Sequence, residues 1–192
     1  RPEAAVGRPP EADWTKEAKS KALKALRAKV ETCRKCPLGS QRLKPAFGVG
    51  SPDAQVMFIG EGPGFEEDHR GEPFVGRAGQ LLDKILASIG LSRETVYIAN
   101  IVKCHAMVNP SNPELRGNDR PPNPEVMEAC FPYLEEQMRI IQPKVLVALG
   151  SVAARTLLRT SEGITTLRGK WRDYQAAPAK PEEMDLFSAG SK

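Results

Sequence analysis

The hydrophobic positions of the chain alternate between short apolar runs and longer amphipathic stretches. Three apolar runs rich in β-branched residues predict buried strands, at residues 55–59, 95–102 and 144–149. Helical periodicity predicts a first helix from a cap at Asp13 to about Val30. It predicts further helices at residues 80–89, 125–141 and 152–158, the last of them capped by Ser151.

The order of these elements predicts an α/β fold. Strands that alternate with helices favour a parallel sheet covered on both faces. In such a sheet, ligand sites gather at the carboxyl ends of the strands. Three positions meet this condition: the loop after Ile59, Asn100 near the end of the second strand, and Gly150 after the third.

Length and composition predict one compact domain. The chain has 192 residues, of which 40% are hydrophobic, and this is enough for a core. We expect a flexible tail at residues 1–12, a domain at residues 13–175 and a second flexible tail at residues 176–192. Residues 105–124, rich in proline and asparagine, predict a long loop within the domain.

The charge and the apolar runs restrict the partners. No run of 18 apolar residues exists and no secretory signal is visible, so we expect a cytoplasmic protein without a membrane partner, although a signal removed before Arg1 stays open. We also expect a monomer. Residues 1–44 hold 12 Lys and Arg against 5 Asp and Glu. This basic arm is either a DNA-phosphate contact or a solvated helix face.

Four cysteines indicate a metal centre. The only cysteines are Cys33, Cys36, Cys104 and Cys130, and the first two form a C-x-x-C pair followed by Pro37. Four thiolates can hold a zinc ion or an iron–sulfur cluster. Ligands from three separate loops favour the cluster, zinc is the main alternative, and unrelated free thiols are the remaining one.

A glycine-rich loop follows the first predicted strand. The string GEGPG at residues 60–64 lets backbone N–H groups approach a ligand. It lacks the Gly-Lys-Ser/Thr of a phosphate-binding loop, and the acidic Glu66, Glu67 and Asp68 would repel a pyrophosphate. Nucleotide binding is therefore not expected, and a purely structural turn stays open.

The longer string GEGPGFEEDHRGEPFVGRAGQLLDKIL, followed by YIANIVKC and VLVALGSVAA, resembles the family 4 uracil-DNA glycosylases over residues 33–171. That resemblance implies an α/β/α sandwich around a mainly parallel four-stranded sheet, a 4Fe–4S cluster, and hydrolysis of the N-glycosidic bond of uracil swung out of DNA. It implies cluster ligands in the order Cys33, Cys36, Cys104 and Cys130. It also implies a uracil pocket formed by Glu61, Gly62, Pro63, Glu67, Phe74 and Asn100.

The implied roles follow the chemistry of each group. Phe74 would stack on the base, and the Asn100 amide would offer a donor and an acceptor to its Watson–Crick edge. Glu61 and Gly62 are the catalytic candidates, Glu61 as the residue that orients the attacking water. Each role has an alternative: Phe74 as a core residue, Asn100 as a loop cap, and Glu67 as a partner of a helix N-terminus.

The C-terminal part departs from the family pattern. The family has one more strand after its Lys-Trp string and then a His-Pro-Ser loop, but neither follows Trp171, and the only histidines are His69 and His105. We therefore expect a missing or altered last strand, and a non-catalytic iron–sulfur DNA-binding module is the alternative function. A third hypothesis is a zinc-stabilised domain unrelated to DNA. In a related branch, a histidine in the loop after the third cysteine becomes linked to the abasic sugar, which we do not expect of His105.

The C-terminal tail suggests one further partner. Leu186 and Phe187 end a polar, proline-rich segment. Such a pair resembles the peptides that bind bacterial sliding clamps, and an unremarkable tail is the alternative.

Overall fold

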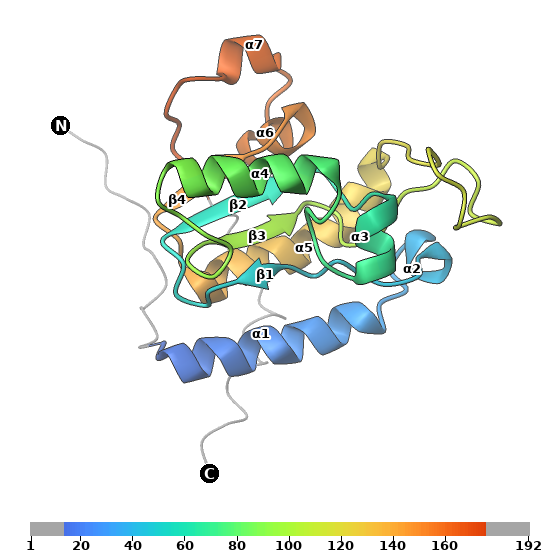
Figure 1. Cartoon of the computed structure of the whole chain (residues 1–192), viewed down its shortest axis with the longest axis horizontal. Coiled ribbons are helices and arrows are strands. Elements are labelled where there is room, and N and C mark those ends of the chain that lie inside the picture. Colours follow the sequence, from blue (N-terminus) through green and yellow to red (C-terminus); the bar gives the residue numbers. More distant parts are fainter. Residues whose placement is uncertain (1–13, 176–192) are drawn as a thin grey trace.

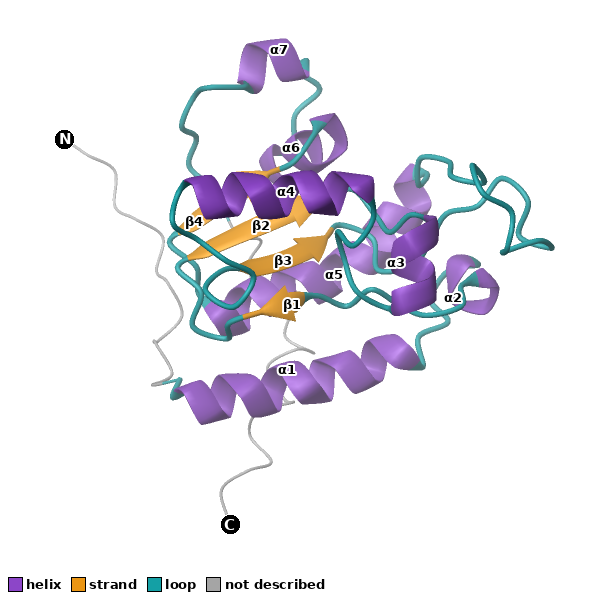
Figure 2. Cartoon of the chain, viewed as in Figure 1, coloured by secondary structure: helices purple, strands orange, loops and turns teal. Residues whose placement is uncertain are grey.

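The computed structural model describes residues 14–175. Seven helices and four strands lie in this range (Figures 1 and 2). In chain order they are α1 (Lys16–Glu31), α2 (Leu38–Gln41), β1 (Val49–Gly50), β2 (Val56–Gly60), α3 (Phe65–Arg70), α4 (Arg77–Ser88), β3 (Tyr97–Asn100), α5 (Pro124–Ile141), β4 (Val145–Ala148), α6 (Ser151–Leu158) and α7 (Ile164–Leu167).

The four strands form one sheet in the order β1-β3-β2-β4. β3 and β4 run parallel to β2, whereas β1 runs antiparallel to β3. This confirms the predicted α/β class with a mainly parallel, four-stranded sheet. The fourth strand, however, is the two-residue β1 before β2, and no strand follows β4 within residues 14–175. β4 is thus an edge strand, and its four residues are only partly buried.

Helices cover both faces of the sheet. Phe58 and Ile98 point to one face and pack with Leu82 and Leu86 of α4. The neighbouring strand residues point to the other face, where they pack against residues of α1 and α5, among them Leu26, Val30, Leu134 and Ile141. Figure 2 shows the sheet between α4 and α5, with α1 beyond β1. The alternation of side chains along a strand produces these two cores.

Two predicted helix caps differ from the observed ones. Asp13 lies outside the described residues, and the side chain of Thr15 accepts the capping hydrogen bond, from the N–H of Ala18 at 3.2 Å. Ser151 is the first residue of α6 and not its cap, which is Gly150 at φ 97°. Only a residue without a side chain adopts this φ freely, so glycine takes the position.

Other boundaries agree with the sequence more closely. α5 begins at the Asn123 cap and continues through Pro132, as the periodicity predicts. α4 begins at Arg77, and the short α3 has no counterpart among the predicted helices. Both predicted tails, and with them Leu186 and Phe187, lie outside the described residues. Across residues 14–175, no helix is both long enough and apolar enough to pass through a bilayer.

The start of α4 packs against the chain that precedes it. A Cβ built on Gly79 would overlap the backbone carbonyl of Phe74. Glycine is therefore required by the close approach of two backbone segments, although alanine is the better helix former.

We predict that Gly79→Ala lowers the free energy of unfolding by about 3 kcal/mol, because backbone cannot move away as a flexible side chain can. This corresponds to a fall of about 10 °C in Tm. Thermal denaturation measures it, with the exposed neighbour Gln80→Ala as the control. Equal Tm values for the two variants would contradict the packing described.

Candidate functional site

The carboxyl ends of two neighbouring strands bring the predicted site residues together. In the parallel pair β2 and β3, Gly60 lies opposite Asn100. The register continues past the strands, since Ile101 N–H donates to Gly60 O at 2.9 Å and Val102 N–H donates to Glu61 O at 3.0 Å. The glycine-rich loop and Asn100 are therefore held side by side, as expected for this edge of a parallel sheet.

Phe74 and Asn100 meet at Gly60. A Cβ built on Gly60 would overlap the Phe74 ring and lie 2.5 Å from Asn100 Oδ1. Asn100 is 1% exposed, and its Oδ1 has no hydrogen-bond partner among the described residues. A buried amide oxygen without a partner costs free energy, so its retention points to a ligand with a donor group.

The backbone at Phe74 is held in an uncommon conformation. Its φ is 55°, in the left-handed region that a bulky residue rarely adopts. The Arg93 guanidinium donates to the carbonyl oxygens of both Pro73 and Phe74. The ring is partly buried against the core cluster that contains Phe58 and Leu82. The Phe74 side chain thus packs on the core, and one edge of its ring lies next to Gly60.

Glu67 binds the backbone at the end of the glycine-rich loop and at the segment just before α4. Its Oε1 accepts from the N–H groups of Val75 and Gly76, both at 2.9 Å, and its Oε2 accepts from Gly64 N–H at 3.2 Å. These bonds join the start of α3 to the segment that carries Phe74. The geometry matches the helix N-terminus interpretation of Glu67 more closely than a direct contact with a base.

An open cleft of about 380 Å³ begins at the glycine-rich loop. Glu61, Gly62, Pro63 and Gly64 line it from one side, and residues 119–122 of the long loop line it from the other. Val102 and Cys104 also line it. The cleft therefore separates the candidate catalytic residues from the long loop and extends toward the cysteines.

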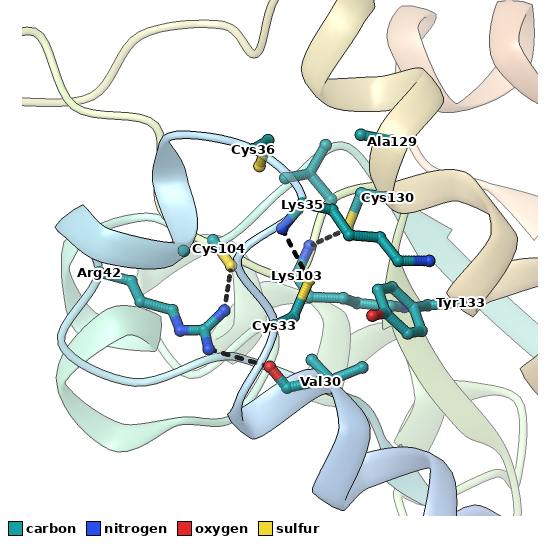
Figure 3. A pocket seen from close by; sticks show the side chains of 12 residues that line it. Val30, Cys33, Lys35, Cys36, Arg42, Lys103, Cys104, Ala129, Cys130 and Tyr133 are labelled. Atoms are coloured by element: carbon teal, nitrogen blue, oxygen red, sulfur yellow. Dashed lines mark hydrogen bonds between the residues drawn. The ribbon is translucent and has the colours of Figure 1, made fainter.

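The four cysteines line one cavity. It lies between the end of α1, the segment after β3 and the helix α5. Figure 3 shows the four sulfur atoms directed into a common space. None of the four forms a disulfide. The structure thus brings together four thiols that are up to 97 positions apart in the sequence.

Donor groups surround these sulfur atoms. The Arg42 guanidinium donates to Cys104 Sγ at 2.8 Å, and backbone N–H groups of Lys103 and Lys35 donate to Cys130 Sγ at 3.3 Å and Cys33 Sγ at 3.5 Å. Burial raises the pKa of the Cys104 thiol to about 11, although the Arg42 hydrogen bond lowers it. Burial also raises the pKa of Cys130. Thiols in such a cavity become thiolates when a metal centre binds them.

Lys103 adds a buried positive charge. Its side chain is fully buried, and Nζ donates to the neutral acceptors Asn100 O at 2.8 Å and Gln137 Oε1 at 2.6 Å. Burial lowers the pKa of Lys103 to about 8, while Cys130 and Cys104 raise it. Four thiolates in the adjacent cavity would supply the negative charge that this buried ammonium lacks.

Four thiols that share one cavity form a donor set suited to a metal centre. Tetrahedral zinc would need its sulfur atoms about 3.8 Å apart, given a Zn–S bond of about 2.3 Å. Within residues 14–175, no group of three or more Cys, His, Asp or Glu side chains has an arrangement suited to one metal ion. The four thiols that face the shared cavity are the kind of ligand set that an iron–sulfur cluster requires.

His105 is buried between two carboxylates, which the sequence did not predict. It is 1% exposed, its Nε2 lies 2.7 Å from Asp119 Oδ1, and its Nδ1 lies 3.6 Å from Asp68 Oδ2. The fully buried Asp68 also accepts from Leu43 N–H at 3.1 Å. His105 therefore joins the long loop to α3. The sequence offered no way to find the His105–Asp68, Arg42–Cys104 and Lys103–Gln137 contacts, because each joins residues far apart in the chain.

The comparisons with known proteins agree with this geometry. The model of the Uracil DNA glycosylase superfamily matches residues 47–187. The chain belongs to this superfamily. It is 43% identical to the type-4 uracil-DNA glycosylase of Archaeoglobus fulgidus over 76% of the chain and 69% of the relative. It is 42% identical to the type-4 enzyme of Thermotoga maritima, over 76% of the chain and 71% of the relative.

A third type-4 uracil-DNA glycosylase, from Pyrobaculum aerophilum, is 40% identical over 77% of the chain and 72% of the relative. The resemblance to the type-4 family inferred from the glycine-rich loop and its companion strings is thereby confirmed. The superfamily membership also confirms the predicted fold class.

For this superfamily member we predict that Glu67→Ala lowers the free energy of unfolding by about 2 kcal/mol, because three backbone N–H groups lose a charged acceptor. Chemical denaturation measures the change. Glu66→Ala is the matched control, since the Glu66 carboxylate pairs at the surface with Arg116 at 3.0 Å and contributes about 0.5 kcal/mol. Equal losses for the two variants would contradict the role given to Glu67.

Proposed function

We propose that the chain excises uracil from DNA by hydrolysis of the N-glycosidic bond, in the manner that the names of its type-4 relatives state. The observation that carries the proposal is the convergence of Gly60, Phe74 and Asn100, with a buried Asn100 Oδ1 that lacks a partner. A flat aromatic ring beside an unsatisfied amide suits a pyrimidine that offers an N–H donor on its edge.

Recognition of uracil would depend on how Phe74 and Asn100 are arranged at Gly60. The Phe74 ring stacks on the extruded base, and Asn100 Oδ1 accepts from the uracil N3–H while its amide group donates to O4. Lys103 supports this geometry, since its Nζ donates to the backbone carbonyl of Asn100. A base with an amino group in place of O4 would present a donor to the Asn100 amide and be rejected.

Cleavage requires stabilisation of the departing uracil anion. The loop that contains Gly62 and Pro63 lines the cleft. Its backbone N–H groups would serve as preorganised donors, which act most strongly where water is excluded. Glu61 lines the same cleft and is our candidate for the group that orients the attacking water. Glu67 acts at a distance, by holding Gly64 and Gly76 in place.

The 4Fe–4S cluster is part of the proposal. Cys33, Cys36, Cys104 and Cys130 would hold it, and Arg42 would stabilise its sulfur ligands by hydrogen bonding. When bound, the cluster supplies a structural crosslink and no step of the hydrolysis. It would fix the segment that leads from Asn100 to Cys104, on which the base-reading amide depends.

Outside the uracil pocket, we propose that α1 contacts the DNA backbone. Its exposed basic residues, Lys16, Lys21, Lys24 and Lys29, support a phosphate-contacting role for the basic arm. The proposed monomeric state and the clamp contact through Leu186 and Phe187 remain separate proposals, the latter on residues outside the described range.

We predict that Asn100→Ala reduces the rate of uracil excision about 100-fold, because the base loses its paired donor and acceptor. Phe74→Ala should reduce it about tenfold through loss of stacking. Single-turnover cleavage of a uracil-containing oligonucleotide measures both rates, with Asn112→Ala on the exposed part of the long loop as the control.

Non-specific DNA binding, measured by fluorescence anisotropy, should stay unchanged in both variants. Equal loss of binding and excision would instead indicate general unfolding. If the wild-type protein, loaded with iron, leaves uracil intact in both single- and double-stranded DNA, the function proposed is wrong. The alternative, a non-catalytic iron–sulfur DNA-binding module of the same fold, would then replace it.

We predict that Cys104→Ala removes most of the iron and lowers the Tm by at least about 10 °C, because metal binding contributes to folding free energy. Iron and sulfide analysis, absorption near 400 nm and thermal denaturation measure the effects. Thr32→Ala, at the exposed end of α1, is the control. Zinc in place of iron in the wild-type protein, or normal iron in the variant, would contradict the assignment.

A further inference from the structure

Phe74 has a backbone conformation that its position in the fold does not explain. Among residues 14–175, three residues other than glycine have a positive φ: Phe74, Gln142 and Arg159. Gln142 and Arg159 each follow the last turn of a helix, where the left-handed conformation is common. Phe74 lies in the loop between α3 and α4 and ends no helix, so its φ of 55° needs another cause.

Hydrogen bonds hold the peptide groups on both sides of Phe74. The Arg93 guanidinium donates from Nη1 to the carbonyl oxygen of Pro73 at 3.1 Å and from Nη2 to the carbonyl oxygen of Phe74. At the other end of the second peptide group, the N–H of Val75 donates to Glu67 Oε1 at 2.9 Å. Rotation of Phe74 to a negative φ would turn at least one of these peptide groups and break its bonds. The left-handed conformation, which costs free energy, therefore persists because its surroundings hold it.

The guanidinium of Arg93 is itself held in place. Its Nε donates to Asp83 Oδ1 of α4 at 2.6 Å, so all three of its nitrogen atoms donate to protein oxygens. The backbone at Arg93 lies in a turn before β3, where Ser92 N–H donates to Thr95 Oγ1 at 3.0 Å and Thr95 N–H donates to Ser92 O at 3.1 Å. A planar, forked side chain can reach one carboxylate and two carbonyl groups at once, whereas lysine has a single nitrogen atom. The three bonds therefore depend on arginine at this position.

The conformation of Phe74 decides where its ring lies. The ring lies against Gly60, beside Asn100, and packs partly on the core below α4. The direction of the Cα–Cβ bond relative to the chain changes when φ changes sign, so at a negative φ the ring would leave Gly60. Loss of Arg93 should then remove the ring from the proposed stacking position without a change at Asn100.

We propose that Arg93 is a positioning residue for base recognition: it holds Phe74 in the left-handed conformation in which the ring stacks on the extruded uracil. This inference rests on the proposed function. Arg93 acts through Phe74, and Asp83 orients its guanidinium. The effect of a substitution at Arg93 should therefore depend on the presence of the Phe74 ring.

The test is Arg93→Ala, alone and combined with Phe74→Ala. The control is Arg139→Ala on α5, because Arg139 also binds a carboxylate through two nitrogen atoms, that of Glu136 at 2.8 and 2.6 Å. In single-turnover excision of a single-stranded uracil oligonucleotide, Arg93→Ala should lose at least about fivefold and the control less than about twofold. In the Phe74→Ala protein, Arg93→Ala should lower the rate by less than about twofold more, since the two residues act as one unit. Losses that multiply in the double variant, or no loss from Arg93→Ala, would overturn the proposal.

Chemical rescue separates positioning from a general loss of structure. Methylguanidinium added to Arg93→Ala should raise the excision rate at least about threefold, because it can donate to the same oxygen atoms, whereas methylammonium at the same concentration should not. Methylguanidinium should not rescue Phe74→Ala. A defect of global stability would instead deepen in a guanidinium salt. Equal effects of the two cations on Arg93→Ala would contradict the role given to the forked side chain.

A last readout does not depend on excision. Chymotrypsin cleaves after phenylalanine, and mass spectrometry reports cleavage of the bond between Phe74 and Val75. Arg93→Ala should be cut there at least about tenfold faster than the wild type, while cleavage after the buried Phe58 stays unchanged. Equal cleavage after Phe74 would overturn the proposal. A wild-type protein that excises nothing but shows this Arg93-dependent protection would refute the proposed function and leave the hold of Arg93 on Phe74 standing.

Discussion

The absence of a side chain at Gly60 is the constraint on which the site depends. The parallel register of β2 and β3 sets Gly60 opposite Asn100, and only a hydrogen at this position lets the Phe74 ring and the Asn100 amide approach each other. The backbone around Phe74 is held by Arg93 and by the close packing of Gly79. Strand pairing, helix packing and backbone hydrogen bonds thus together place Phe74 and Asn100 next to Gly60.

The segment after β3, residues 101–104, connects Asn100 to the cysteine cavity. Four residues after Asn100, the chain reaches Cys104, and between them Lys103 donates to the Asn100 carbonyl and to Gln137 of α5. The buried ammonium needs a negative partner, which the proposed thiolate cluster would supply. The Asn100 amide and the cysteine cavity are therefore linked through Lys103, and a change at the cysteines should alter the position of the Asn100 amide.

The sequence predicted those parts of the molecule in which local pattern decides the structure. The apolar runs at β2, β3 and β4 and the periodicity of α5 each specify their element. The two-residue β1 and the six-residue α3 have too few residues for a periodic pattern, and α3 depends on Glu67 bonds to distant backbone. The Asp13 and Ser151 caps were wrong because a neighbouring residue takes each position: the Thr15 side chain accepts from Ala18 N–H, and Gly150 adopts the φ of 97° that the start of α6 requires.

The sequence named the residues of the candidate site but not the residues that hold them in place. Phe74 and Asn100 come from the motif strings, while the Arg42–Cys104, Lys103–Gln137 and His105–Asp68 contacts join segments far apart in the chain. Glu67 shows the limit most clearly, since its carboxylate serves three backbone N–H groups of the scaffold.

The most direct test of this account is the excision rate of Gly60→Ala. An added methyl group would overlap the Phe74 ring and crowd Asn100 Oδ1, so single-turnover cleavage of single-stranded uracil DNA should fall at least about 100-fold while the iron content stays at the wild-type level. A Gly60→Ala protein that excises uracil at the wild-type rate would contradict the central claim.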